Sequence, residues 1–234
     1  MEGNRVMFNI DFSSVTNSWR FLLDGAAFTL ELTLVAVAGG LLLGTLIAVA
    51  RLSHKWWLKT LASAYVNAIR SVPLVLLLFW VFFLMPELLR YLVGASRPVT
   101  VEASVSAMVT FVVFEAAYFA EIIRAGIGSV KSGQLAAAAA LGLNYAQTMR
   151  FVILPQAVKH MLPVLLTQVI VVFQDTSLVY VISANDFLGA CSKIAQRDSQ
   201  LILMYLLAAV VYLTVSLALS RSVRRFEKRG ALTH

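Results

Sequence analysis

Long apolar segments without charge limit how this chain can fold. One of them, Leu32–Ala50, contains no charged residue. Across the 234 residues, 60% are hydrophobic and 13% are charged, and the mean hydropathy of +0.83 lies outside the range of soluble domains. A helix needs about 20 apolar residues to cross a hydrocarbon core about 30 Å thick. The sequence therefore predicts an all-α membrane protein.

Five segments have the length of a membrane span. They cover about residues 26–50, 71–89, 103–124, 161–182 and 201–220. Residues 59–70 fit less simply, because a helix continuous with the second span would be too long for one bilayer. We expect that segment to lie partly in the interface or to bend near Pro73. We find no linker, which predicts one transmembrane domain over residues 1–234 with its core at about 20–225.

Basic connecting segments alternate with balanced ones. Arginine and lysine are in surplus in residues 51–59, 124–159 and 221–234, whereas acids and bases nearly balance in residues 1–24, 87–102 and 186–198. The positive-inside rule then places the N-terminus outside and the C-terminus in the cytoplasm. The net charge of +7 is thus a topology signal, and we expect no nucleic-acid partner.

Several kinds of chemistry find no support in the sequence. The single cysteine, Cys191, is expected to be a small packing residue. The three histidines lie far apart without ligand spacing, so we expect no metal site. No phosphate-cradling glycine motif of the P-loop type is present. If ATP drives this protein, another chain must bind it.

The connection between the third and fourth spans is basic and rich in alanine. The run Ala136–Ala140 favours a helix, and Gly142 can form a sharp corner after it. Pro155 and Pro163 are expected to mark the start of the next span. A helix–corner–helix on one side of a membrane is typical of a docking element for a soluble protein. The alternative is that Ala136–Gly142 is only a solvated amphipathic helix.

Three motifs in order resemble one transporter family. E-I-I-R-A-G-I begins at Glu121, G-Q-L-A-A-A-A-A-L-G at Gly133 and I-L-P-Q-A at Ile153. This order resembles the EAA loop of ABC-importer permeases, in particular the polar amino acid uptake family (histidine, glutamine and glutamate type). R-S-V-P at residues 70–73 and F-Q-D-T-S-L-V-Y-V at 173–181 also match, and residues 165–187 most resemble glutamate/aspartate permeases.

The resemblance implies a non-catalytic permease subunit in the bacterial cytoplasmic membrane. It would carry no cofactor, while a dimer of ABC ATPase subunits binds ATP and Mg²⁺. A second permease subunit, identical or homologous, and an extracytoplasmic solute-binding protein would complete an importer for glutamate and aspartate. Glutamine, arginine or histidine remain alternative cargoes, and a stand-alone ion-coupled carrier is a further alternative.

The resemblance also implies which residues contact the ATPase. They are Gly133, Gln134, Ala136, Ala137, Ala138, Leu141, Gly142 and Pro155. Ala136 stands where the family usually has glutamate, so this chain lacks the carboxylate that can pair with a basic residue of the ATPase. We expect docking here to depend on shape, apolar packing and the positive charges of the loop.

Polar residues within the spans are candidates for the substrate pathway, because charge at membrane depth generally faces a bundle interior or an aqueous path. The candidates are Asp175, Thr176, Ser177, Gln168 and Glu115. Asp175 has a structural alternative, in which it caps a helical half or bonds a neighbouring helix across the seam between two permease subunits. Glu115 can bind a substrate ammonium or be protonated and buried.

Four further residues are expected to be structural. Glu121 and Arg124 are three residues apart on one helix face and are expected to pair. Arg70 precedes Pro73, and it and Arg124 are expected near the cytoplasmic surface, where anchoring explains them as well as a substrate contact does.

Overall fold

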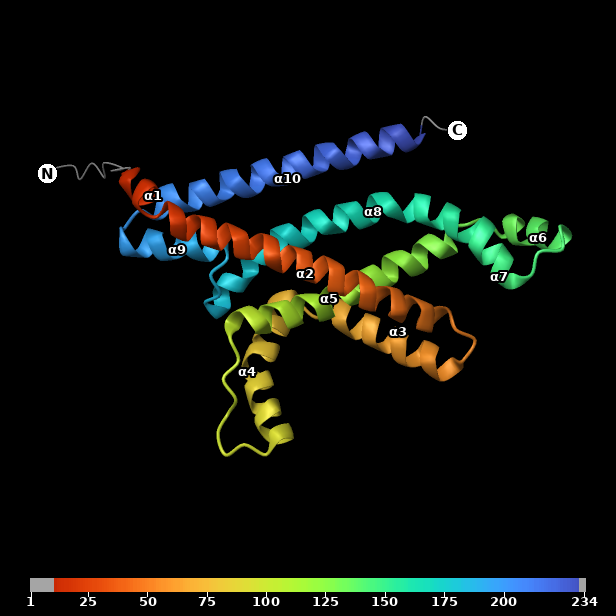
Figure 1. Cartoon of the computed structure of the whole chain (residues 1–234), viewed down its shortest axis with the longest axis horizontal. Helices are drawn as coiled ribbons and strands as arrows, with labels where there is room; N and C mark the ends of the chain where they lie inside the picture. The colour runs from red at the N-terminus through yellow and green to blue at the C-terminus, as the bar shows by residue number, and fades with distance from the viewer. Residues whose placement is uncertain (1–10, 232–234) are drawn as a thin grey trace, which may run out of the picture.

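A computed structural model describes residues 11–231 of the chain, and the side chains of residues 11–225. Within that range every regular element is a helix (Figure 1). The elements are α1 (Ser13–Asn17), α2 (Trp19–Leu52), α3 (Trp56–Arg70), α4 (Leu74–Val93), α5 (Ala103–Gly128), α6 (Ser132–Ala140), α7 (Tyr145–Thr148), the π-helix η1 (Met149–Ile153), α8 (Leu154–Asp175), the 3₁₀ helix η2 (Thr176–Ile182), α9 (Phe187–Arg197) and α10 (Leu201–Ala231).

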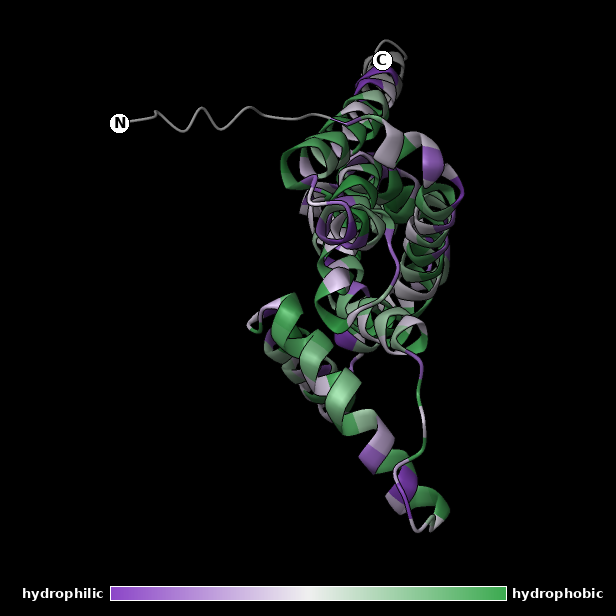
Figure 2. Cartoon of the chain, turned by 90° about the vertical axis from the view of Figure 1, so that its left-hand side faces the viewer, coloured by the Kyte–Doolittle hydropathy of each residue, from purple (hydrophilic) through white to green (hydrophobic). Residues whose placement is uncertain are grey.

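Five helical runs are long and apolar enough to cross a membrane, as predicted. They are α2, α4, α5, the run Tyr145–Ile182 and the part of α10 over Leu201–Arg225. Several exceed the predicted spans. The 34 residues of α2 extend about 51 Å, well beyond a hydrocarbon core of about 30 Å. Hydrophobic residues run along most of the helices (Figure 2), and many large apolar side chains are exposed, as contact with lipid requires.

The predicted break near Pro73 is confirmed. Helix α3 ends at Arg70, and Pro73 in an extended conformation precedes α4. The proline ring disfavours helical geometry in the residue before it, so the two helices cannot merge into one rod. Helix α4 then leaves the bundle at a steep angle (Figure 1).

Close contact between α2 and α5 forms the centre of the bundle. Added at Gly40, a Cβ atom would lie 2.8 Å from the Cβ of Glu115, and at Gly44 it would lie 2.8 Å from the Cβ of Phe119. Spacing of small residues by four positions lets membrane helices approach at their backbones. The glycines of α2 therefore set how α5 lies against it.

The end of the bundle near α9 is a second, smaller core. Cys191 is buried there among Leu22, Ile194 and Met204, which confirms its packing role. The buried carboxylate of Asp186 accepts hydrogen bonds from the backbone N–H groups of Leu188 and Gly189, both at 3.0 Å, and so caps α9.

Candidate functional site

A buried polar cluster joins α5 and α8 inside the bundle. Glu115 is fully buried, and its Oε2 accepts a hydrogen bond of 2.9 Å from Nε2 of Gln168. Its Oε1 is buried without a hydrogen-bond partner among the described residues. Asp175 lies two helical turns beyond Gln168, on roughly the same face of α8. The structure thus joins two of the five pathway candidates by a hydrogen bond and places a third on the same helix face.

The junction of α8 and η2 places Asp175 where the helix tightens. Asp175 is half-buried and makes no side-chain capping bond to η2, so the capping alternative is wrong in this structure. The hydroxyls of Thr176 and Ser177 donate to the carbonyls of Phe173 and Gln174, at 2.7 and 2.8 Å. These two hydroxyls therefore serve the local backbone, unlike the carboxylate beside them.

Sequence reasoning missed one polar link at this depth. Gln174 donates from Nε2 to Oγ of Ser216 on α10, at 3.1 Å. An open groove of about 330 Å³ between α8 and α10 is lined by Thr167, Gln174 and Arg224 among others. Thr167 and Gln174 are seven residues apart in α8 and so lie on one helix face, and this spacing was a signal for the second polar face.

An arginine cluster surrounds Glu121. Arg124 donates to it from Nη2 at 2.5 Å and from Nε at 3.2 Å, so the predicted pair forms. Arg51, from the end of α2, donates to Oε2 of the same carboxylate. Arg70, from the end of α3, comes within 3.9 Å of it. One carboxylate therefore holds the ends of three helices together.

One of these arginines has a role that the sequence analysis missed. Arg51 was counted only as a topology charge, yet it is a direct partner of Glu121, and its side chain is 10% exposed. Arg70 is the last residue of α3, which runs back from the α2–α3 turn toward the middle of the bundle (Figure 1). Its expected place near the cytoplasmic surface stays a prediction.

The chain between α6 and α7 forms a corner that is fixed by its own backbone; we call residues 132–148 the α6–α7 corner. Gly142 adopts φ 74°, a conformation that suits glycine. The N–H of Leu143 bonds to the carbonyl of Ala138, and that of Gly142 to Ala139, which is a Schellman motif. Asn144 and Gln147 then form a capping box that starts α7.

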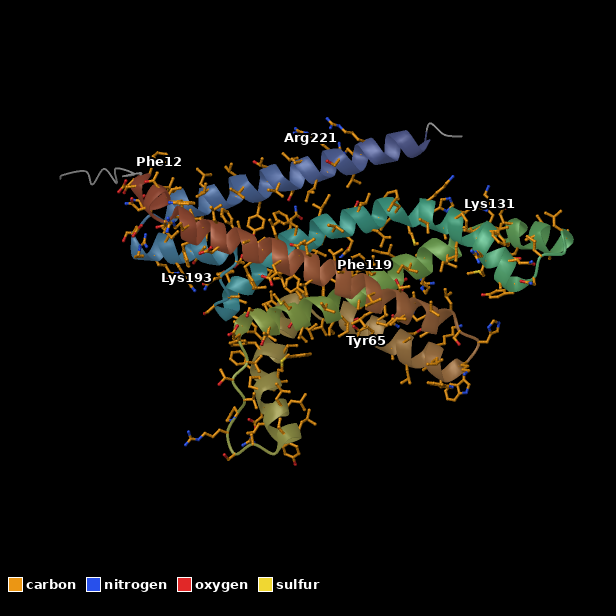
Figure 3. The ribbon with its side chains drawn as sticks, viewed as in Figure 1. Phe12, Tyr65, Phe119, Lys131, Lys193 and Arg221 are labelled. Atoms are coloured by element: carbon orange, nitrogen blue, oxygen red, sulfur yellow. The ribbon has the colours of Figure 1, made fainter. Side chains whose placement is uncertain are left out.

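The α6–α7 corner exposes apolar side chains at the extreme end of the molecule. Leu141 is 80% exposed and Tyr145 is 66% exposed, whereas Ala138 is buried. Gly133, Gln134, Ala136 and Ala137 also lie on the exposed surface. In Figure 3, Lys131 lies at this end and Lys193 at the opposite one.

The two prolines after the corner have different positions. Pro155 lies in the first turn of α8, as predicted. Pro163 lies inside α8, so its expected role as a helix start is wrong. The missing N–H of Pro163 removes one helical hydrogen bond, to the carbonyl of Lys159, and the helix continues through the proline. One turn later, Thr167 donates its hydroxyl to the carbonyl of Pro163 at 2.9 Å. The π-helix η1 ends at Ile153, directly before the first turn of α8.

No three histidine, cysteine, aspartate or glutamate side chains of the described residues are grouped to hold a metal ion. A family model described as binding-protein-dependent transport system inner membrane component matches residues 40–230.

The chain belongs to this family. It is 48% identical to the glutamate/aspartate import permease protein GltK of Escherichia coli O6:H1, over 96% of this chain and 100% of GltK. It is 32% identical to the probable glutamine ABC transporter permease protein GlnP of Bacillus subtilis, over 89% of this chain and 93% of that one. The fold matches a solved amino acid ABC transporter, crystallised with histidines, at a TM-score of 0.86 and 32% identity, covering 94% of this chain and 99% of that one.

These likenesses fix the class of protein. The chain is a permease subunit of an ABC importer, a multi-pass protein of the inner membrane, and it has no catalytic role of its own. The predicted family and the all-α fold with five membrane spans are confirmed, whereas the orientation and the cytoplasmic coupling loop stay predictions. The roles of single residues in the corner and in the polar cluster remain predictions.

Proposed function

We propose that this permease imports glutamate and aspartate. The observation that carries the cargo is the 48% identity to GltK along its whole length, against 32% to the glutamine permease GlnP. A binding protein outside would deliver the amino acid, and two permease subunits would enclose the path between them. ATP and Mg²⁺ would bind to a pair of ATPase subunits beneath.

The α6–α7 corner is proposed as the ATPase contact. Its exposed leucine and tyrosine side chains suit burial by a protein surface, and it shares one end of the molecule with the α2–α3 turn and the end of α10 (Figure 1). All three segments are basic, which supports a cytoplasmic location. Because Ala136 offers no carboxylate, docking would rely on shape and apolar contact.

The polar cluster of Glu115, Gln168 and Asp175 is proposed as part of the path. Carboxylates suit the ammonium group that every amino acid carries, and Gln168 adds an amide that can donate or accept. Glu115 is closed off in this structure, so a change in the position of α8 against α5 would have to open it.

The test is reconstitution of the complex. Purification of this chain with its companions, followed by mass identification, should recover an ATPase, a second permease and a binding protein. ATP-driven uptake of glutamate and aspartate in proteoliposomes should then exceed that of glutamine, arginine and histidine. Preferred uptake of one of those three would reject the cargo, and uptake by the purified chain alone under an ion gradient would reject the mechanism.

A further inference from the structure

Arg70 has a guanidinium group that the rest of the described chain leaves largely unused. Its one ionic neighbour is Glu121, and the 3.9 Å between Nη1 and Oε2 is too long for a hydrogen bond. Its other contact is the ring of Tyr118, whose centroid lies 5.3 Å from Cζ. This contact involves the face of the guanidinium group. The N–H donors, which point outward in the plane of the guanidinium, remain available for hydrogen bonds.

The neighbouring arginines are different. Arg124 directs two nitrogens at Glu121, and Arg51 directs one at the same carboxylate. These bonds engage both oxygens of Glu121. Three guanidinium groups thus share one carboxylate, and the cluster keeps a surplus of two positive charges.

From this surplus, we propose that Arg70 binds a carboxylate group of the transported amino acid as it passes through the membrane. Guanidinium binds carboxylate through two parallel charge-assisted hydrogen bonds, which fix the orientation of the bound group as well as its position. The proposal deepens the proposed function and rests on it, because it needs an amino acid as cargo.

The setting of Arg70 prepares it for this contact. Tyr118 supports one face of the guanidinium, and the attraction of Glu121 limits its swing, so little side-chain freedom remains to be lost on binding. The side chain is 40% exposed within this chain, which leaves it accessible from one side.

The position of Arg70 also complements the acidic cluster. Tyr118 follows Glu115 by three residues in α5, so both lie on one side of that helix. Glu115 and Asp175 offer negative charge to an ammonium, and Arg70 offers positive charge to a carboxylate. A free amino acid carries both groups, which an inorganic ion does not.

The experiment uses the reconstituted complex with Arg70→Gln, Arg70→Lys and, as a control for lost charge, Arg97→Gln in an exposed loop. Glutamate binding to the complex is measured without the binding protein, beside uptake per ATP hydrolysed. We expect Arg70→Gln to raise the dissociation constant about tenfold to a hundredfold, the range for one lost charged hydrogen-bonded contact. Arg70→Lys should recover part of the loss, and Arg97→Gln should match the wild type.

Each other outcome overturns the proposal. Unchanged glutamate binding in Arg70→Gln would overturn it. So would the result that both Arg70 variants lower the thermal stability and leave glutamate binding unchanged. A lipid phosphate is the other source of such an anion. If Arg70→Gln instead loses phosphatidylglycerol in native mass spectra while glutamate binding stays normal, the group at Arg70 is a lipid headgroup. Failure of the wild type to take up any amino acid would refute the proposed function itself.

Discussion

At the scale of single residues, Asp186 shows how a buried acid can both cap a helix and depend on pH. Burial raises the pKa of Asp186 to about 6, although the backbone N–H groups of Gly189 and Leu188 pull it back in part. Because the native pKa lies above the unfolded one, the native state binds the proton more tightly. Its contribution to stability is present at low pH and is lost as the pH rises through about 6.

Asp186→Asn should remove this pH dependence while keeping the cap, because asparagine is also a good N-cap residue. We expect the melting temperature of the variant, relative to wild type, to be higher at pH 7.5 than at pH 4.5. Asp186→Ala should instead be less stable at both, by about 1 kcal/mol for the lost cap. Thermal melting in detergent measures this, and an identical offset for Asp186→Asn at the two pH values would contradict it.

Glu121 makes a second prediction at this scale. Glu121→Gln leaves Arg51 buried without its counter-charge, and breaking a buried ion pair from one side costs on the order of 3 kcal/mol. We expect a clear drop in the melting temperature of the purified protein. Glu87→Gln, which breaks the exposed pair with Arg90, is the control and should change little. Equal effects of the two variants would refute a structural role for the cluster.

At the scale of elements, the contact of α2 with α5 depends on missing side chains. Gly44→Ala would put a Cβ 2.8 Å from that of Phe119 and 2.9 Å from the carbonyl oxygen of Ala116. Gly128→Ala, at the end of α5, would meet nothing within 4 Å. Both changes raise helix propensity by about 1 kcal/mol. We expect Gly44→Ala to destabilise the purified protein and Gly128→Ala to be neutral or stabilising, and loss of the difference would reject the close packing.

The α6–α7 corner carries the next prediction. Leu141→Glu places a charge at its most exposed apolar position without altering the corner backbone, so we expect ATP hydrolysis to lose its link to uptake while the protein reaches the membrane normally. Leu141→Met keeps the apolar surface and should retain coupling. Transport and ATPase rates in proteoliposomes measure both, and full transport by Leu141→Glu would reject this docking role.

Features set by local backbone chemistry could be predicted from the sequence. The bend at Pro73, the corner at Gly142 and the pairing of Glu121 with Arg124 depend on residues close together in the chain. Contacts between distant helices could not. The bond from Gln168 to Glu115 joins α8 to α5, and the glycines of α2 let α5 approach α2. No single segment encodes either contact.

At the scale of the whole molecule, the basic connecting segments of the sequence lie together at one end of the structure. The α2–α3 turn, the α6–α7 corner and the end of α10 gather at one end, and α9 lies at the other (Figure 1). We expect a membrane-impermeant maleimide to label Ser96→Cys in intact cells, and Ser132→Cys only after permeabilisation, in a Cys191→Ala background. Both serines are exposed, and Cys191 is buried. The reverse pattern would invert the predicted orientation.

The geometry of the α6–α7 corner is maintained by main-chain bonds around Gly142 and by the capping residues Asn144 and Gln147. The exposed side chains of the corner take no part in these bonds. Leu141 and Tyr145 can therefore vary without redirecting the helices that carry them. Matching this permease to a different motor subunit would require only a few surface substitutions, and the bundle above would keep its form.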